Sequence, residues 1–169
     1  VWAIAQDKRG VVYAGCSDGE VLEYDGTRWR HIPLPNFDSV VRSLHVAQDG
    51  TMYVGSKKEL GYLEPDENGQ LRYVSLMEHI PPNDREFQDV WNTFETPDGI
   101  YFYSYTRLLR WKNNRFKTWD IYTNGSPNYI QGHLYITGRD GKLLRLENDR
   151  LVTVTQRAEF VRGIMAILP

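Results

Sequence analysis

The residues that could catalyse a reaction or bind a metal are few and scattered. The histidines His31, His45, His79 and His133 form no His-x-x-x-His pair, and Cys16 is the only cysteine. Zinc sites are typically built from closely spaced His and Cys ligands. The sequence also lacks a Gly-x-Ser-x-Gly nucleophile turn and a glycine-rich phosphate loop. We therefore predict no catalytic residue, no metal site and no cofactor, and we expect Cys16 to be a small packed residue.

Residues suited to binding a small polar ligand gather in candidate loops. Segment 77–89 is long and charged, and Pro81 and Pro82 stiffen it. Aromatic rings beside the fork-shaped donors of Arg suit a sugar or a small anion. Ordinary solvated loop charges remain the alternative for every one of these positions. The candidate ligand-binding residues are Lys57, Lys58, His79, Asp84, Arg85, Glu86, Tyr105, Arg107, Arg139 and Asp140.

The composition is that of a folded globular segment. Hydrophobic residues make up 41% of the 169 residues and charged residues 25%, which argues against disorder. The net charge is −2 and no basic run reaches four residues, so we expect no nucleic acid partner. No apolar run approaches the roughly 20 residues of a membrane helix, so we expect no membrane contact by this segment. Val1 opens directly into a strand-like pattern without a signal peptide, so we expect a piece of something longer.

The elements that would position these loops follow from an internal repeat. Four times, a turn glycine is followed three residues later by an aromatic residue, and the glycines lie 40, 49 and 33 residues apart. A unit of roughly 40 to 50 residues with four short strands is typical of a β-propeller blade. The repeated pairs are Gly10 and Tyr13, Gly50 and Tyr53, Gly99 and Phe102, and Gly132 and Tyr135.

The predicted fold is all-β, a partial β-propeller of four-stranded antiparallel blades. We expect a single segment over 1–169, with blades at about 1–34, 40–76, 90–119 and 127–155 and the first strand of a further blade in 160–169. A sandwich or barrel is the alternative, but neither requires an aromatic residue at the same offset four times. The sequence shows no convincing helix. The segment is expected to be about half of a ring, completed by the rest of a propeller or by a second copy.

The repeat resembles the two-component regulator propeller repeat of bacterial sensor proteins. That repeat places an Asp before the turn glycine, an aromatic after it, and then a pair of small residues. The matching residues are Asp7, Gly10, Tyr13 and Gly15-Cys16 in the first unit, Asp49-Gly50, Tyr53 and Gly55-Ser56 in the second, and Asp98-Gly99 and Phe102 in the third, where Ser104 stands in place of glycine.

The resemblance implies a non-catalytic, ligand-sensing input domain of a two-component type regulator. Such domains are usually periplasmic or extracytoplasmic, precede a membrane span and an output module, and in several cases sense a glycan fragment. Ligands of propellers usually bind where the inter-blade links and the links between second and third strands meet, which is where we place the candidate residues. A propeller enzyme acting on carbohydrate and a protein-interaction or dimerisation scaffold remain alternatives. A single cysteine leaves a cytoplasmic location open.

Overall fold

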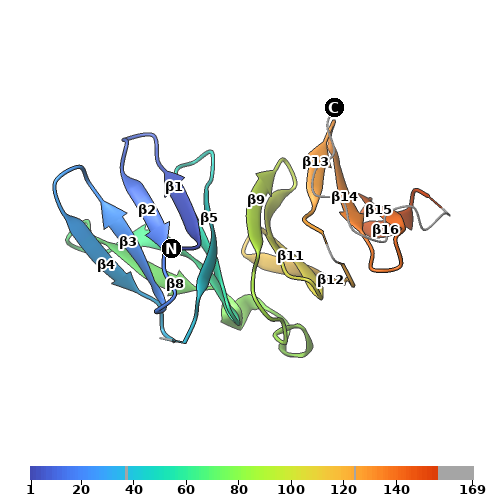
Figure 1. Cartoon of the computed structure of the whole chain (residues 1–169), viewed down its shortest axis with the longest axis horizontal. Helices are drawn as coiled ribbons and strands as arrows, with labels where there is room; N and C mark the ends of the chain where they lie inside the picture. The colour runs from blue at the N-terminus through green and yellow to red at the C-terminus, as the bar shows by residue number, and fades with distance from the viewer. Residues whose placement is uncertain (37, 124, 156–169) are drawn as a thin grey trace.

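The computed structural model describes residues 1–36, 38–123 and 125–155 (Figure 1). These residues form four antiparallel sheets, and in each sheet four consecutive strands pair in chain order. The first blade contains β1 (Ala3–Gln6), β2 (Val12–Gly15), β3 (Glu20–Tyr24) and β4 (Trp29–Pro33). The second contains β5 (Val41–Val46), β6 (Met52–Ser56), β7 (Glu59–Pro65) and β8 (Leu71–Ser75).

The third blade contains β9 (Asn92–Thr96), β10 (Gly99–Tyr103), β11 (Arg107–Lys112) and β12 (Arg115–Asp120). The fourth contains β13 (Asn128–Ile130), β14 (His133–Thr137), β15 (Leu143–Glu147) and β16 (Arg150–Thr153). The blades follow one another without closing into a ring, which confirms the predicted partial propeller (Figure 1). The strand expected in 160–169 lies outside the described residues. Two 3₁₀ turns, Met77–His79 and Pro82–Asp84, lie in the long inter-blade link where the sequence predicted no helix.

The repeated Asp and Gly fix the turn between the first two strands of a blade. Asp7 accepts hydrogen bonds from the backbone N–H of Arg9 at 2.9 Å and of Val11 at 3.1 Å. Gly10 closes the same turn with a φ of +87°, in the left-handed region that favours glycine. In the second blade, Gly50 has a φ of +92°. The repeat motif therefore encodes turn geometry rather than chemistry.

Separate apolar clusters hold neighbouring blades together. Tyr13 and Val21 of the first blade pack with Val54 and Leu63 of the second. In the third blade, Leu109 belongs to the cluster shared with the second blade, whereas Leu108 belongs to the cluster shared with the fourth. Adjacent residues of a strand point to opposite faces, so this blade is buried on both sides. Each fully buried aliphatic side chain contributes roughly 1.5–3 kcal/mol.

The structure corrects the alignment of the third unit by one residue. Phe102 joins the cluster shared with the preceding blade. Tyr101 joins the cluster shared with the following blade and is thus the counterpart of Tyr13. The reason is turn length: Gly99 already pairs with Thr96 inside the sheet, so β10 begins at its glycine, whereas β2 and β6 begin two residues after theirs.

The glycine two residues after each of the first two repeat aromatics allows the next blade to approach. A Cβ on Gly15 would lie 2.5 Å from Cγ1 of Val41, and one on Gly55 would lie 2.5 Å from Cγ1 of Val90. Both neighbours belong to the segment that leads into the innermost strand of the next blade, or to that strand itself. These glycines are therefore packing positions.

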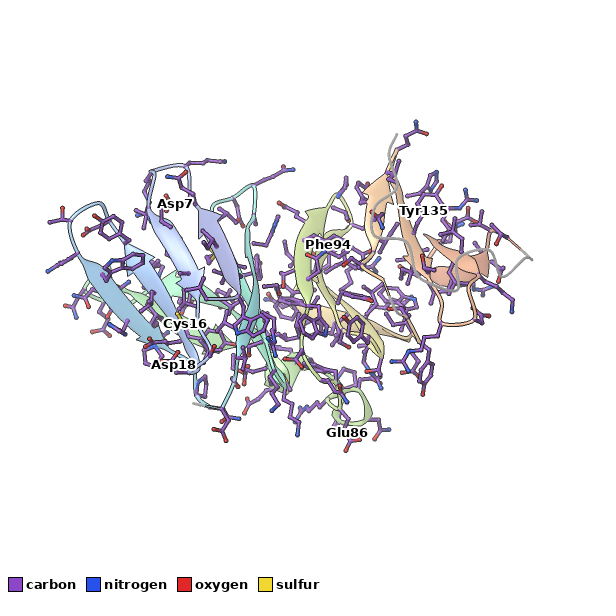
Figure 2. The ribbon with its side chains drawn as sticks, viewed as in Figure 1. Asp7, Cys16, Asp18, Glu86, Phe94 and Tyr135 are labelled. Carbon is purple, nitrogen blue, oxygen red and sulfur yellow. The ribbon has the colours of Figure 1, made fainter. Side chains whose placement is uncertain are left out.

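The blades present two kinds of loop at opposite ends. We call one end the linker face; it is formed by the links between second and third strands and by the links between blades. The other end, the hairpin face, carries the remaining turns. Figure 2 shows Cys16, Asp18 and Glu86 toward the linker face and Asp7 at the opposite end. Among the described residues, no helix has the length and apolarity needed to cross a membrane.

Candidate functional site

A pocket of about 540 Å³ opens on the linker face between the second and third blades. We call it the linker-face pocket. It is formed by the link within the second blade, the long inter-blade link, the link within the third blade and the start of the link to the fourth. Four of the predicted residues line it, namely Lys58, Arg85, Glu86 and Arg107. The other lining residues are Asn83, Phe87, Gln88, Thr106, Asp120 and Tyr122.

Arg107 is held in place at the base of this pocket by two carboxylates. Its guanidinium binds Asp84 at 2.5 Å and Asp120 at 3.0 Å. Thr118 donates a further hydrogen bond to Asp84 at 2.6 Å. The predicted residue Asp84 therefore positions Arg107 rather than lining the pocket. One nitrogen of Arg107, Nε, is buried and has no hydrogen-bond partner within the described part of the chain.

The long inter-blade link is fixed by its own backbone contacts. Arg85 donates from Nε to the carbonyl of Ile80 at 2.9 Å and from Nη2 to the carbonyl of Glu78 at 3.0 Å. Ile80 and Phe87 are buried in the cluster between the second and third blades. The link is thus an ordered wall, as expected for a binding loop on a rigid scaffold.

Two further predicted residues lie in an adjacent pocket of about 430 Å³. Arg139 and Asp140 line this second pocket, which shares Asp120 and Tyr122 with the linker-face pocket. Arg139 donates from its backbone N–H to the carbonyl of Tyr122 at 2.7 Å and from Nε to the carbonyl of Thr123 at 3.2 Å. The two pockets therefore form one continuous surface from the second blade to the fourth.

A buried tyrosine supports the link that both pockets share. The hydroxyl of Tyr103 donates to the carbonyl of Gly125 at 2.5 Å and also contacts Thr123. Burial raises the pKa of Tyr103 to about 12. The phenol is therefore neutral near physiological pH and acts as a hydrogen-bond donor.

A stacked arginine that the sequence did not predict lies beside the pocket. The guanidinium of Arg42 lies 4.0 Å from the ring centroid of Trp2 and 4.7 Å from that of Trp91, and Nε binds Asp89 at 2.8 Å. These side chains come from three successive blades or from the segments that lead into them, and Asp89 follows Gln88 of the pocket wall. No local motif signals this stack, because its members lie about 40 to 50 residues apart.

Besides Asp84, three predicted residues lie outside both pockets. The ring of His79 packs edge-to-face on Trp111, with 5.1 Å between ring centroids. Tyr105 packs against Trp91 at 5.5 Å. Lys57 pairs through its backbone with the segment that enters the third blade. His79 therefore lies apart from the linker-face pocket. Lys57 and Tyr105 do not line this pocket, but each directly precedes a residue that does, Lys58 or Thr106.

A group of potential metal ligands lies in the first blade. Cys16, Asp18 and Glu20 bring ligand atoms within 4.8 Å of one another. Burial, followed by the neighbouring charge of Asp18, raises the pKa of the Cys16 thiol, which disfavours the thiolate that metals bind. Glu20 also contacts the Nδ1 atom of His31 at 2.8 Å. We assign no metal to this group.

Comparison with known proteins bears on the fold. No family model and no curated protein matches the sequence. Among solved structures, virginiamycin B lyase from Staphylococcus aureus superposes over 93% of this chain and 56% of its own, with 17% identity and a TM-score of 0.64. BamB from Moraxella catarrhalis superposes over 90% of this chain and 47% of its own, with 16% identity and a TM-score of 0.59.

Another solved structure superposes over more of the chain. The extracellular domain of BT4673 from Bacteroides thetaiotaomicron, assigned to one-component or hybrid two-component systems, covers 98% of this chain at 16% identity with a TM-score of 0.69. The present chain spans 23% of that domain and about half of the lyases. This likeness shows the fold alone: the described residues form part of a β-propeller of the kind found in a two-component regulator and in unrelated propeller proteins.

Proposed function

We propose that this chain is a ligand-recognition segment of a bacterial sensor propeller and that its ligand binds in the linker-face pocket. One observation supports the proposal most strongly. Four segments that are distant in sequence meet at one pocket, and three cations, Lys58, Arg85 and Arg107, line it. Binding residues are found disproportionately on loops that a rigid scaffold positions.

The role of input domain in an extracytoplasmic signalling receptor is part of this proposal. The likeness to the extracellular domain of BT4673 supports it at the level of fold. Fold alone does not give function, so the recognition role depends on the residues that line the pocket.

The lining residues favour a small polar ligand with hydroxyl or carboxylate groups. Arg85 and Arg107 provide planar donors, whereas Asn83 and Gln88 provide amide donors and acceptors. Tyr122 is 68% exposed at the rim and offers a ring on which a sugar could stack. Glu86 adds a carboxylate acceptor for hydroxyl groups.

A propeller enzyme is the second candidate, because virginiamycin B lyase shares the fold. A histidine-to-alanine variant of that lyase is catalytically inactive. The residues that line the linker-face pocket of this chain include no histidine in the part of the chain that the structure describes. The pocket therefore favours binding over the chemistry of that lyase.

An association role concerns a different surface. Ile4 is 72% exposed and Trp29 is 52% exposed on the face of the first blade that points away from the second. The opposite face of the same sheet packs against a blade, so we propose that a further blade covers this one. Light scattering across a concentration series assigns that blade to a second copy if a stable dimer forms. If the chain is a monomer at all concentrations, we assign the covering blade to the remainder of a ring.

The ligand proposal is tested by a thermal-shift screen of neutral and acidic oligosaccharides. The compared proteins are the wild type, Lys58→Ala and, as a charge-matched control in the first blade, Lys8→Ala. We expect at least one oligosaccharide to stabilise the wild type saturably. Lys58→Ala should lower the affinity for that oligosaccharide at least five-fold, whereas Lys8→Ala should leave the affinity unchanged. Equal affinity of all three proteins for every hit would contradict the assignment of this pocket.

A further inference from the structure

A third pocket, on the hairpin face, is lined mainly by cations. It measures about 470 Å³ and lies at the closed end of the β11–β12 hairpin. We call it the hairpin pocket. Four of its six lining residues are basic and none is acidic. The lining residues are Arg110, Lys112, Asn113, Arg115, Phe116 and Lys117.

The sheet register places these cations directly opposite one another. Arg110 pairs with Lys117 and Lys112 pairs with Arg115 across the two strands. Residues at alternate positions share a face, so all four side chains belong to one face of the hairpin. Like charges that oppose each other directly destabilise a sheet. The arrangement therefore costs folding stability unless an anion offsets it.

The turn holds this register in place. Asn113 and Asn114 have φ values of 51° and 57°, the left-handed pair expected for a two-residue hairpin turn whose twist matches the strands. A two-residue loop of this type fixes which residues face each other. Lys112 and Arg115 thus cannot move apart by a change of register.

Carboxylates from the protein offset only part of this charge. Asp149 of the fourth blade binds Arg110 at 2.7 Å and Lys117 at 2.9 Å. Asp98 lies 3.9 Å from Lys112 and is 70% exposed. Four cations against these two carboxylates leave two positive charges. Nε of Arg110 is also buried without a hydrogen-bond partner within the described residues.

We propose that the hairpin pocket binds a doubly charged tetrahedral oxyanion, the phosphate monoester group of a small ligand, for which inorganic sulfate and phosphate serve as probes. A dianion matches the two uncompensated charges, and Arg is the preferred partner of such groups because its donors are planar and forked. The site is separate from the linker-face pocket. Arg107 and Lys112 are five residues apart on one strand, which spans about 17 Å.

The test is an NMR titration of the isotope-labelled chain at neutral pH. Sodium sulfate and sodium phosphate are each added at constant ionic strength, with sodium chloride as the balance and sodium acetate as the monoanion control. We expect the amide signals of residues 112–117 to shift saturably with sulfate and phosphate. An exposed site of this kind should show a dissociation constant on the order of 1 mM.

Two double variants remove the same charge from different places. Lys112→Gln with Arg115→Gln should weaken sulfate binding at least five-fold, whereas Lys8→Gln with Arg28→Gln in the first blade should leave it unchanged. Because the first variant relieves a like-charge pair, its unfolding midpoint should not fall below that of the wild type. Equal shifts with acetate, or equal sulfate affinity in both variants, would overturn the proposal. Tighter binding of a single-stranded oligonucleotide through the same amides would overturn it in favour of a polyanion site.

Discussion

The packing of the second blade on the third is tested by Gly55→Ala. The added Cβ would lie 2.4 Å from Oγ of Ser43, 2.5 Å from Cγ1 of Val90 and 2.8 Å from Oγ1 of Thr93. Ordinary contacts of a Cβ begin near 3.4 Å, so the neighbouring strand has to move by up to about 1 Å. That movement acts on both sides of the blade interface.

Two effects of Gly55→Ala lower the free energy of unfolding and a third partly offsets them. Overpacking of a filled site costs roughly 1–3 kcal/mol. The shift also disturbs the hydrogen bonds of Ser43 to Thr93 at 2.8 Å and to the carbonyl of Val90 at 2.9 Å, each contributing about 1 kcal/mol. Replacing glycine by alanine also stabilises the protein by about 0.4–1 kcal/mol, because it lowers the conformational entropy of the unfolded chain. We expect a net loss of about 3 kcal/mol, or a fall in Tm of roughly 6–12 °C for a chain of this size.

Urea unfolding followed by tryptophan fluorescence measures the loss. Gly138→Ala is the matched control, because the nearest atom to its added Cβ is the carboxylate Oδ1 of Asp140, at 2.6 Å on a side chain that can turn toward solvent. The control should lose less than about 1 kcal/mol. If Gly55→Ala lost no more than the control, the close approach of the two blades would be refuted.

Three further predictions concern charge and stacking. The hydrogen bonds from Lys117 and Arg110 lower the pKa of Asp149, so its stabilisation is complete above the unfolded pKa of about 4 and is lost as pH falls further; Asp149→Asn should flatten the acid limb of an unfolding series between pH 5 and pH 2. Burial raises the pKa of Tyr103 to about 12, so stability should fall as pH rises from about 10 to 12, and Tyr103→Phe should reduce that loss. Arg42→Lys should cost about 1–2 kcal/mol in urea unfolding, because an ammonium cannot stack between two indoles as a guanidinium does. Each prediction fails if the variant follows the wild-type curve.

The propeller fold was predictable because the turn between the first two strands of each blade requires particular residue types. Gly10 and Gly50 adopt positive φ, and Asp7 accepts a hydrogen bond from the backbone of its own turn. These requirements make the turns recognisable in the sequence. The shift of one residue in the third unit was not predictable from the glycine spacing. It depends on whether Gly99 lies in the turn or in the strand, which only the pairing with Thr96 reveals.

The site was predictable in outline because inter-blade links meet at one face in this fold. Lys58, Arg85 and Arg107 were expected on that face and line one pocket there. The sequence could not show that Asp84 binds Arg107, since the two residues lie 23 positions apart. It also placed His79 with the site, whereas its ring packs on Trp111.

The basic lining of the hairpin pocket could not be predicted from the order of charges in the sequence. Arg110, Lys112, Arg115 and Lys117 form no continuous basic run, and the sequence therefore gave no reason to expect an anion site. The register of β11 with β12 brings them onto one face. Charge clusters in β proteins are a property of strand pairing, so they become visible only when the register is known.

Ligand binding in the linker-face pocket is tested by mapping where a stabilising oligosaccharide binds, using amide shift changes in the isotope-labelled chain. We expect saturable changes that centre on residues 58, 85–88, 106–107 and 122, the walls of the linker-face pocket. Changes confined to the hairpin face, or to the exposed face of the first blade, would contradict it.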